Sequence, residues 1–117
     1  MGYKINGMMI AGGSAGGTMA LLYAFRDAAS APVPVKMVMS QVGPASFERE
    51  DWDIYGLDKN AYGAASMFSG MSGKEITTEM IEDGSYAEAV KNISADKWVN
   101  ENSVPALLAY GKHDKVC

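Results

Sequence analysis

One serine stands inside a glycine cluster near the start of the chain, where residues 12–17 run Gly-Gly-Ser-Ala-Gly-Gly. Gly12, Ser14 and Gly16 match the pattern G-x-S-x-G, which has a chemical meaning where a strand turns sharply into a helix. Such a turn lifts the serine hydroxyl above the sheet, and the first amides of the helix face any oxyanion formed there. The pattern therefore predicts that Ser14 is a nucleophile and that the Ala15 amide donates a hydrogen bond to the oxyanion.

Other interpretations of the same residues are a phosphate-binding loop and a tight turn without chemistry. Gly12 and Gly17 have the spacing of G-x-x-x-x-G, but Thr18 stands where that motif needs lysine, and no glycines fit G-x-G-x-x-G. The letters alone are weak evidence, because the chain has 13 glycines. The packing turn without chemistry stays open as the alternative to the nucleophile.

The elements around Ser14 are those that a nucleophile turn needs. An apolar run over residues 4–12 predicts a buried strand, residues 15–28 predict a buried helix that the prolines of "SAPVP" end, and residues 35–43 predict a second strand. Strand, helix and strand within so short a stretch form a βαβ unit with parallel strands. The chain is thus expected to be α/β, a small parallel sheet with helices on both faces.

The middle of the chain has a looser pattern. Residues 75–84 and 85–94 predict short helices, the second with a capping box of Ser85 and Glu88. Strand character returns in "VPALLAYGKHD". We therefore expect one domain over residues 1–117, with a helical insertion over 46–102 before the last strand.

Composition narrows the function classes. The net charge is −4 without a basic stripe, which argues against a nucleic-acid partner. No apolar run has the length of a membrane span, and the start has no signal-peptide pattern. The one cysteine, Cys117, allows no intrachain disulfide, which fits a cytoplasmic location. No cluster of histidine, cysteine or carboxylate has the spacing of a metal site, so neither a metal nor a cofactor is expected.

The stretch "MMIAGGSAGGTMALLYAF" resembles the nucleophile elbow of the α/β-hydrolase superfamily, particularly its esterase and lipase branch. "ISADKWVNENSVPALLAYGKHDKV" resembles the approach to the strand that bears the acid of that family. There Gly111, Asp114 and Cys117 match G-x-x-D-x-x-V, with cysteine where an apolar residue is usual. The resemblance is weakest over residues 47–75. It implies a serine hydrolase of small carboxylic esters, with Ser14 as nucleophile and Asp114 as the acid that orients a histidine.

The sequence does not show a histidine at the position that the resemblance implies. In the resembled family it follows the acid, whereas the single histidine here, His113, neighbours Asp114 and is expected to be an ordinary loop residue. The family's N-terminal strands and His-Gly-Gly segment are also absent from the sequence, so the activity of this chain alone is expected to be impaired or lost. Asp114 itself could be a turn former. A peptidase on the same fold and a non-catalytic fragment or self-assembling module remain alternatives.

Other residues carry weaker expectations. Trp52, Tyr55, Met67 and Trp98 could line a substrate pocket, although ordinary packing is the simpler interpretation of each. An acidic run is most simply a solvated loop; its members are Glu48, Glu50, Asp51 and Asp53. The strand over residues 8–11 is expected to leave one edge unpaired, and through that edge the chain is expected to form a homo-oligomer.

Overall fold

The computed structural model describes residues 2–52 and 57–114. They fall into two compact units. The sheet unit contains the chain up to Ala45 and the chain from Trp98 onward, and the helical unit is Ser46–Lys97. Each unit has its own core.

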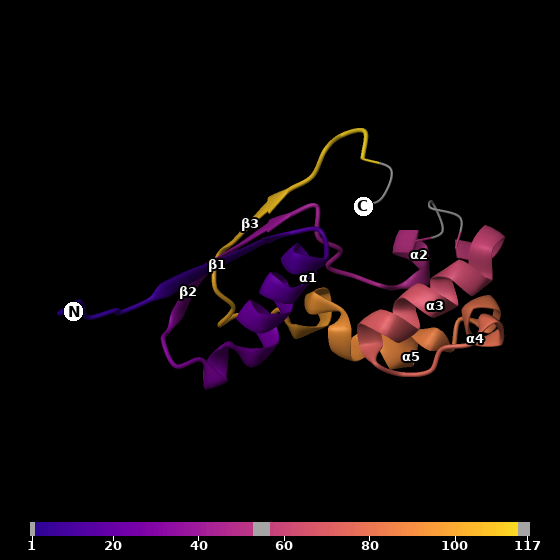
Figure 1. The fold of residues 1–117 in the computed structure, drawn as a ribbon, viewed down its shortest axis with the longest axis horizontal. Helices are drawn as coiled ribbons and strands as arrows, with labels where there is room; N and C mark the ends of the chain where they lie inside the picture. Colours follow the sequence, from indigo (N-terminus) through magenta and orange to yellow (C-terminus); the bar gives the residue numbers. More distant parts are fainter. Residues whose placement is uncertain (1, 53–56, 115–117) are drawn as a thin grey trace. The chain divides into compact units, whose positions relative to one another are not determined.

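The sheet unit is built on three parallel strands, β1 (Met8–Gly13), β2 (Val35–Gln41) and β3 (Ala106–Ala109), in the order β1-β2-β3 (Figure 1). This confirms the predicted α/β class with its parallel sheet and flanking helices. The first strand begins later than predicted, because the residues before Met8 join no ladder. The prediction that it is buried is wrong: its residues alternate between half-buried and exposed, because β1 is the first strand of the sheet and pairs with β2 on one side.

Helix α1 (Ala15–Leu22) follows β1 directly and continues as a π-helical segment, Tyr23–Asp27, and a 3-10 turn, Ala28–Ser30. The predicted helix over 15–28 is therefore confirmed, with changes of helix type along it. Its apolar residues cover most of the circumference, and Leu21 is fully buried. Prolines follow in the connection to β2, where the helix cannot continue.

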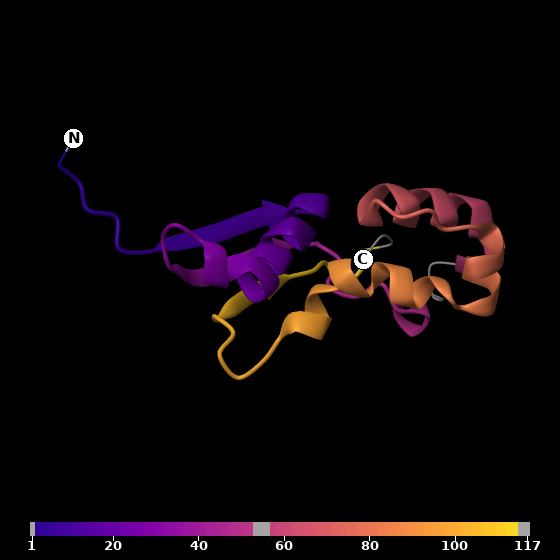
Figure 2. The same cartoon turned by 90° about the horizontal axis from the view of Figure 1, so that it is seen from below.

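Helix α1 covers one face of the sheet (Figures 1 and 2). On β2, the side chains of Val38 and Ser40 are fully buried, whereas those of Met37 and Met39 on the opposite face are half-buried. The sheet unit contains no described helix on this second face, so helices on both faces are not found within it. Strand β2 is thus fully buried on one face of the sheet and only partly buried on the other.

The helical unit contains α2 (Arg49–Trp52), a 3-10 turn over Leu57–Asn60, and helix α3 (Ala61–Ser72). It continues with α4 (Thr78–Asp83), α5 (Tyr86–Val90) and 3-10 turns over Lys91–Ile93 and Ala95–Trp98.

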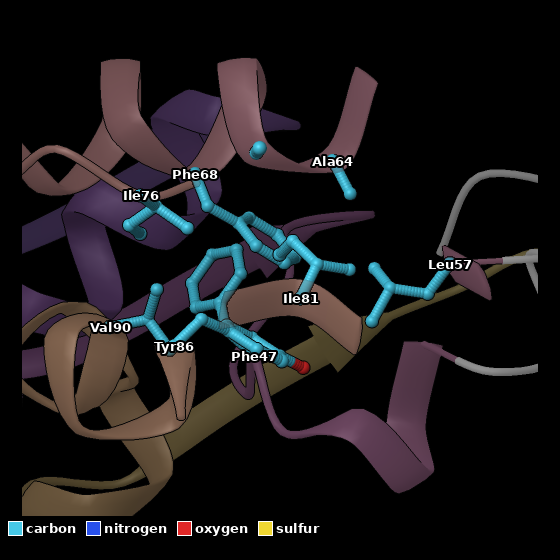
Figure 3. Close-up of a cluster of buried hydrophobic side chains, with 9 residues drawn as sticks. Phe47, Leu57, Ala64, Phe68, Ile76, Ile81, Tyr86 and Val90 are labelled. Atoms are coloured by element: carbon cyan, nitrogen blue, oxygen red, sulfur yellow. The ribbon is translucent and has the colours of Figure 1, made fainter. Parts of the chain in front are cut away.

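Figure 3 shows the core of the helical unit, which is aromatic at its centre. The rings of Phe68 and Tyr86 are stacked with centroids 5.3 Å apart, and Phe47 meets Phe68 edge-on at 5.7 Å. These geometries are the favourable ones for aromatic pairs. The unit therefore holds together through its own buried side chains.

Helix starts in this unit differ from the prediction. Asn60 caps α3, because its Oδ1 accepts a hydrogen bond from the Gly63 amide at 3.0 Å. The predicted capping box at Ser85 is wrong: Ser85 has helical backbone angles and its side chain makes no cap bond. Its amide instead donates to Oδ1 of Asp83 at 2.7 Å. The turn between α4 and α5 is thus too tight for a separate cap.

Candidate nucleophile elbow

Ser14 is the one residue between the end of β1 and the start of α1, and its backbone is strained. Its φ of 51° and ψ of −127° lie in a region that residues other than glycine rarely adopt. The cost of such a conformation is about 1–3 kcal/mol, and such residues cluster at functional sites. The predicted sharp strand-to-helix turn at Ser14 is therefore present.

The Ser14 side chain is exposed and makes no capping bond to the helix that it precedes. Serine at a helix start ordinarily accepts a bond from the second or third helical amide. Here that task falls to the Ser14 carbonyl, which accepts from Gly17 at 2.8 Å and from Thr18 at 3.2 Å. The hydroxyl is thus left available to solvent or to a ligand.

The first two helical amides, those of Ala15 and Gly16, have no acceptor within the helix, because helical bonding starts further along the chain. The amide of Ala15, predicted as an oxyanion donor, directly follows Ser14 and belongs to this set. The positive end of the α1 dipole lies at the same place. When Ser14 Oγ attacks a carbonyl carbon, the oxyanion forms on the oxygen attached to that carbon, and the Ala15 amide and the positive end of α1 are the features here that favour such a charge.

The glycines of the turn allow contacts that a side chain would prevent. A Cβ on Gly12 would collide with the carbonyl of Gly16, and one on Gly17 would lie 2.5 Å from Oγ of Ser40. Gly43, just beyond β2, would likewise meet Ser40 and the backbone of Gly17. These close approaches explain the small residues on both sides of Ser14.

Neighbouring strands hold the turn in place. The Ser14 amide donates to the carbonyl of Gln41, the last residue of β2, at 2.8 Å. The Thr18 hydroxyl donates to the carbonyl of Pro44 at 2.7 Å, and so ties α1 to the loop after β2. The turn is therefore fixed from both of its ends.

Val42 is a second strained residue at the carboxyl ends of the strands, with a φ of 50° immediately after β2. A β-branched residue is a marked outlier in this region. Its amide donates to the carbonyl of Ala109 in β3 at 2.9 Å, which keeps the chain in the sheet at this point. Sequence reasoning did not identify Val42, and valine gives no signal for such a conformation.

Asp114 lies in a turn after β3, half-buried, and its amide donates to the Gly111 carbonyl at 3.0 Å. Just before this turn, the Tyr110 hydroxyl donates to the carbonyl of Gly43 at 2.6 Å. Tyr110, which sequence reasoning also did not identify, thus connects the loop that carries Asp114 to the loop beside the Ser14 turn.

Ser14 and Asp114 both follow the carboxyl ends of their strands, and carboxyl ends of parallel strands meet at one edge of a sheet. Because β2 lies between β1 and β3, two strand spacings of roughly 4.8 Å each separate those strands. An imidazole that joined the two side chains would have to span the width of β2. His113 is exposed and adjacent to Asp114 in the chain.

Other predicted residues have structural roles or lie elsewhere. Trp52 is half-buried, stacks on Phe47 with centroids 5.7 Å apart, and donates from Nε1 to the Ser46 carbonyl at 2.9 Å. Met67 and Trp98 are partly exposed, and Tyr55 lies outside the described residues. The structure therefore supports ordinary packing for Trp52.

The acidic run is not one solvated loop. Glu48 forms an ion pair of 2.6 Å with Lys97, while Glu50 and Asp51 are exposed on α2. Asp53 lies outside the described residues. Within this run, Glu48 thus contributes an ion pair to the helical unit.

Among the described residues, no group of histidine, cysteine and carboxylate side chains could hold a metal ion. The helices within residues 2–52 and 57–114 include none long and apolar enough to cross a membrane. Comparison with protein-family models, curated proteins and solved structures finds no match to this chain.

Proposed function

We propose that the chain carries the nucleophile turn of a serine hydrolase that acts on carboxylic esters, of the α/β-hydrolase type that its motifs resemble. The observation that supports this most is the strained backbone of Ser14, at φ 51° and ψ −127°, between strand β1 and helix α1. A turn that only connects the two elements gains nothing from such strain.

In the proposed reaction, Ser14 Oγ attacks the ester carbonyl while a base takes the hydroxyl proton. The carbonyl oxygen becomes an oxyanion that accepts a hydrogen bond from the Ala15 amide. The intermediate collapses to an acyl-Ser14 ester, and the leaving alcohol departs with the proton from the base. Water, activated by the same base, then releases the acid and restores Ser14.

The base of this scheme is an imidazole oriented by Asp114. Because His113 and Asp114 are neighbours in the chain, their side chains leave the backbone in different directions. We therefore do not expect His113 to lie between the Asp114 carboxylate and Ser14. The proposal therefore assigns the base to a histidine other than His113 of the same molecule. Without it, the first step is expected to be slow and acylation to be detectable before turnover.

An acylation experiment tests the proposal. The chain is incubated with a p-nitrophenyl ester of a short acid, and the product is analysed by intact mass and peptide mapping. We expect one acyl group, on Ser14, that Ser14→Ala abolishes and Ser66→Ala leaves unchanged, since Ser66 is an exposed serine on α3. Equal acylation of the two variants would overturn the proposal and favour a turn without chemistry.

A further inference from the structure

One edge of the sheet has no partner within the described part of the chain. Strand β1 pairs only with β2, and the amides of Met8 and Ser14 both donate toward that side, to Pro34 and Gln41. Because successive residues of a strand alternate, the amides of Met9 and Ala11 point away from β2. They form the open edge.

This edge lacks the features that usually block strand pairing. Natural edge strands carry lysine, proline or inward-pointing charges, whereas β1 reads Met-Met-Ile-Ala-Gly-Gly. Its outer side is therefore a row of hydrogen-bonding groups flanked by small or apolar side chains.

An apolar groove of about 460 Å³ runs beside the same edge, between β1 and α1. None of the described residues that line it is charged, and Met8, Ile10, Met19 and Tyr23 are among them. Met19 projects from α1 with 69% of its surface exposed, a large fraction for an apolar side chain beside a groove. The edge and the groove together form one uncharged surface on a chain of net charge −4.

We propose that this surface binds a second copy of the chain. The two β1 strands pair antiparallel about a two-fold axis, so that the sheet continues across the interface and the two α1 helices lie side by side on the same face. In such an interface each residue meets its own copy or a near neighbour. A surface without charge avoids the like-charge repulsion that this symmetry would otherwise create, and the two grooves close over each other's Met19.

Molecular mass in solution tests the pairing. We expect a dimer by sedimentation equilibrium at micromolar concentration, and a monomer when Met19 is replaced by glutamate or by lysine. Since Met19 is mostly exposed in one copy, either charge leaves the fold intact, which circular dichroism checks. Tyr62→Glu is the matched control, because Tyr62 is 80% exposed on α3 in the helical unit.

A mixing experiment tests the geometry. Met19→Glu and Met19→Lys chains, each monomeric alone, are expected to form a heterodimer when mixed, because opposite charges then face each other across the axis. A monomeric mass for the unaltered chain, or dimers that persist in both single variants, would overturn the proposal. A mixture that stays monomeric would overturn the placement of the two α1 helices. Ser14→Ala is expected to leave the dimer unchanged. The dimer and the proposed hydrolase activity are therefore tested independently.

Discussion

The amide of Ser14 donates a 2.8 Å hydrogen bond to the carbonyl oxygen of Gln41, which joins the strained turn after β1 to the last residue of β2. The residue after Gln41, Val42, is itself strained and bonds onward to Ala109 in β3. The carboxyl ends of all three strands are thus held by a chain of backbone bonds. The strained backbone of Ser14 is therefore held by the hydrogen-bonded carboxyl ends of all three strands, and not by its own loop alone.

Substitution of Gly12 tests how tightly this turn is packed. Gly12→Ala is expected to lower the free energy of unfolding by about 1–3 kcal/mol, because the added methyl group collides with the Gly16 carbonyl. Urea denaturation measures the loss. Gly16→Ala is the matched control: a methyl group there meets nothing within 4 Å, and alanine favours a helix over glycine by about 1 kcal/mol. If Gly16→Ala proved the more damaging of the two, the described turn geometry would be wrong.

The Tyr110 hydroxyl is expected to stabilise the sheet edge. Tyr110→Phe removes the 2.6 Å bond to the Gly43 carbonyl and keeps the ring, so the free energy of unfolding should fall by about 1 kcal/mol. Chemical denaturation compares it with Tyr62→Phe, which alters a hydroxyl on a mostly exposed side chain and should change little. Identical stability of the two variants would argue against the tether between the loops after β2 and β3.

Helix caps in the helical unit give an independent check on its structure. Asn60→Ala should lower the free energy of unfolding by about 0.5–2 kcal/mol, because the Gly63 amide loses its acceptor. Ser85→Ala should cost much less, since the Ser85 side chain caps nothing. Thermal unfolding of the two variants distinguishes this structure from the capping box that the sequence predicts. A larger loss of stability for Ser85→Ala than for Asn60→Ala would favour the capping box.

The Arg26–Asp27 pair predicts a dependence of stability on pH. The hydrogen bond from Arg26 at 2.8 Å, aided by its charge, lowers the pKa of the Asp27 carboxyl against the opposing effect of burial. A depressed folded-state pKa adds stability that is complete above the unfolded value of about 3.9 and is lost as pH falls through the folded value.

Asp27→Asn is therefore expected to lower stability at neutral pH by less than about 1 kcal/mol, because the pair is partly exposed. The difference from the unaltered chain should vanish on acidification below the folded-state pKa of Asp27. Denaturation curves at several pH values measure it. A difference that grew toward acid pH would contradict this account of the pair.

The location of the Ser14 turn could be predicted because glycines interrupt two apolar runs, and such an interruption has few structural meanings. The α/β class followed from the same alternation of strand and helix. Helix α3 was not predicted, since its glycines, Gly63 and Gly70, obscure the helical period, although Asn60 and Gly73 mark its ends. The strain at Val42 could not be predicted, because only the bonds of its neighbours in the sheet impose it on a β-branched residue.

The reactivity of Ser14 tests the central claim most directly. A fluorophosphonate probe is incubated with the chain, with and without free imidazole as a substitute base, and the adduct is located by peptide mapping. The account predicts a single adduct on Ser14, formed faster with imidazole and absent in Ser14→Ala. No adduct in the presence of imidazole, or labelling spread equally over other exposed serines, would contradict it.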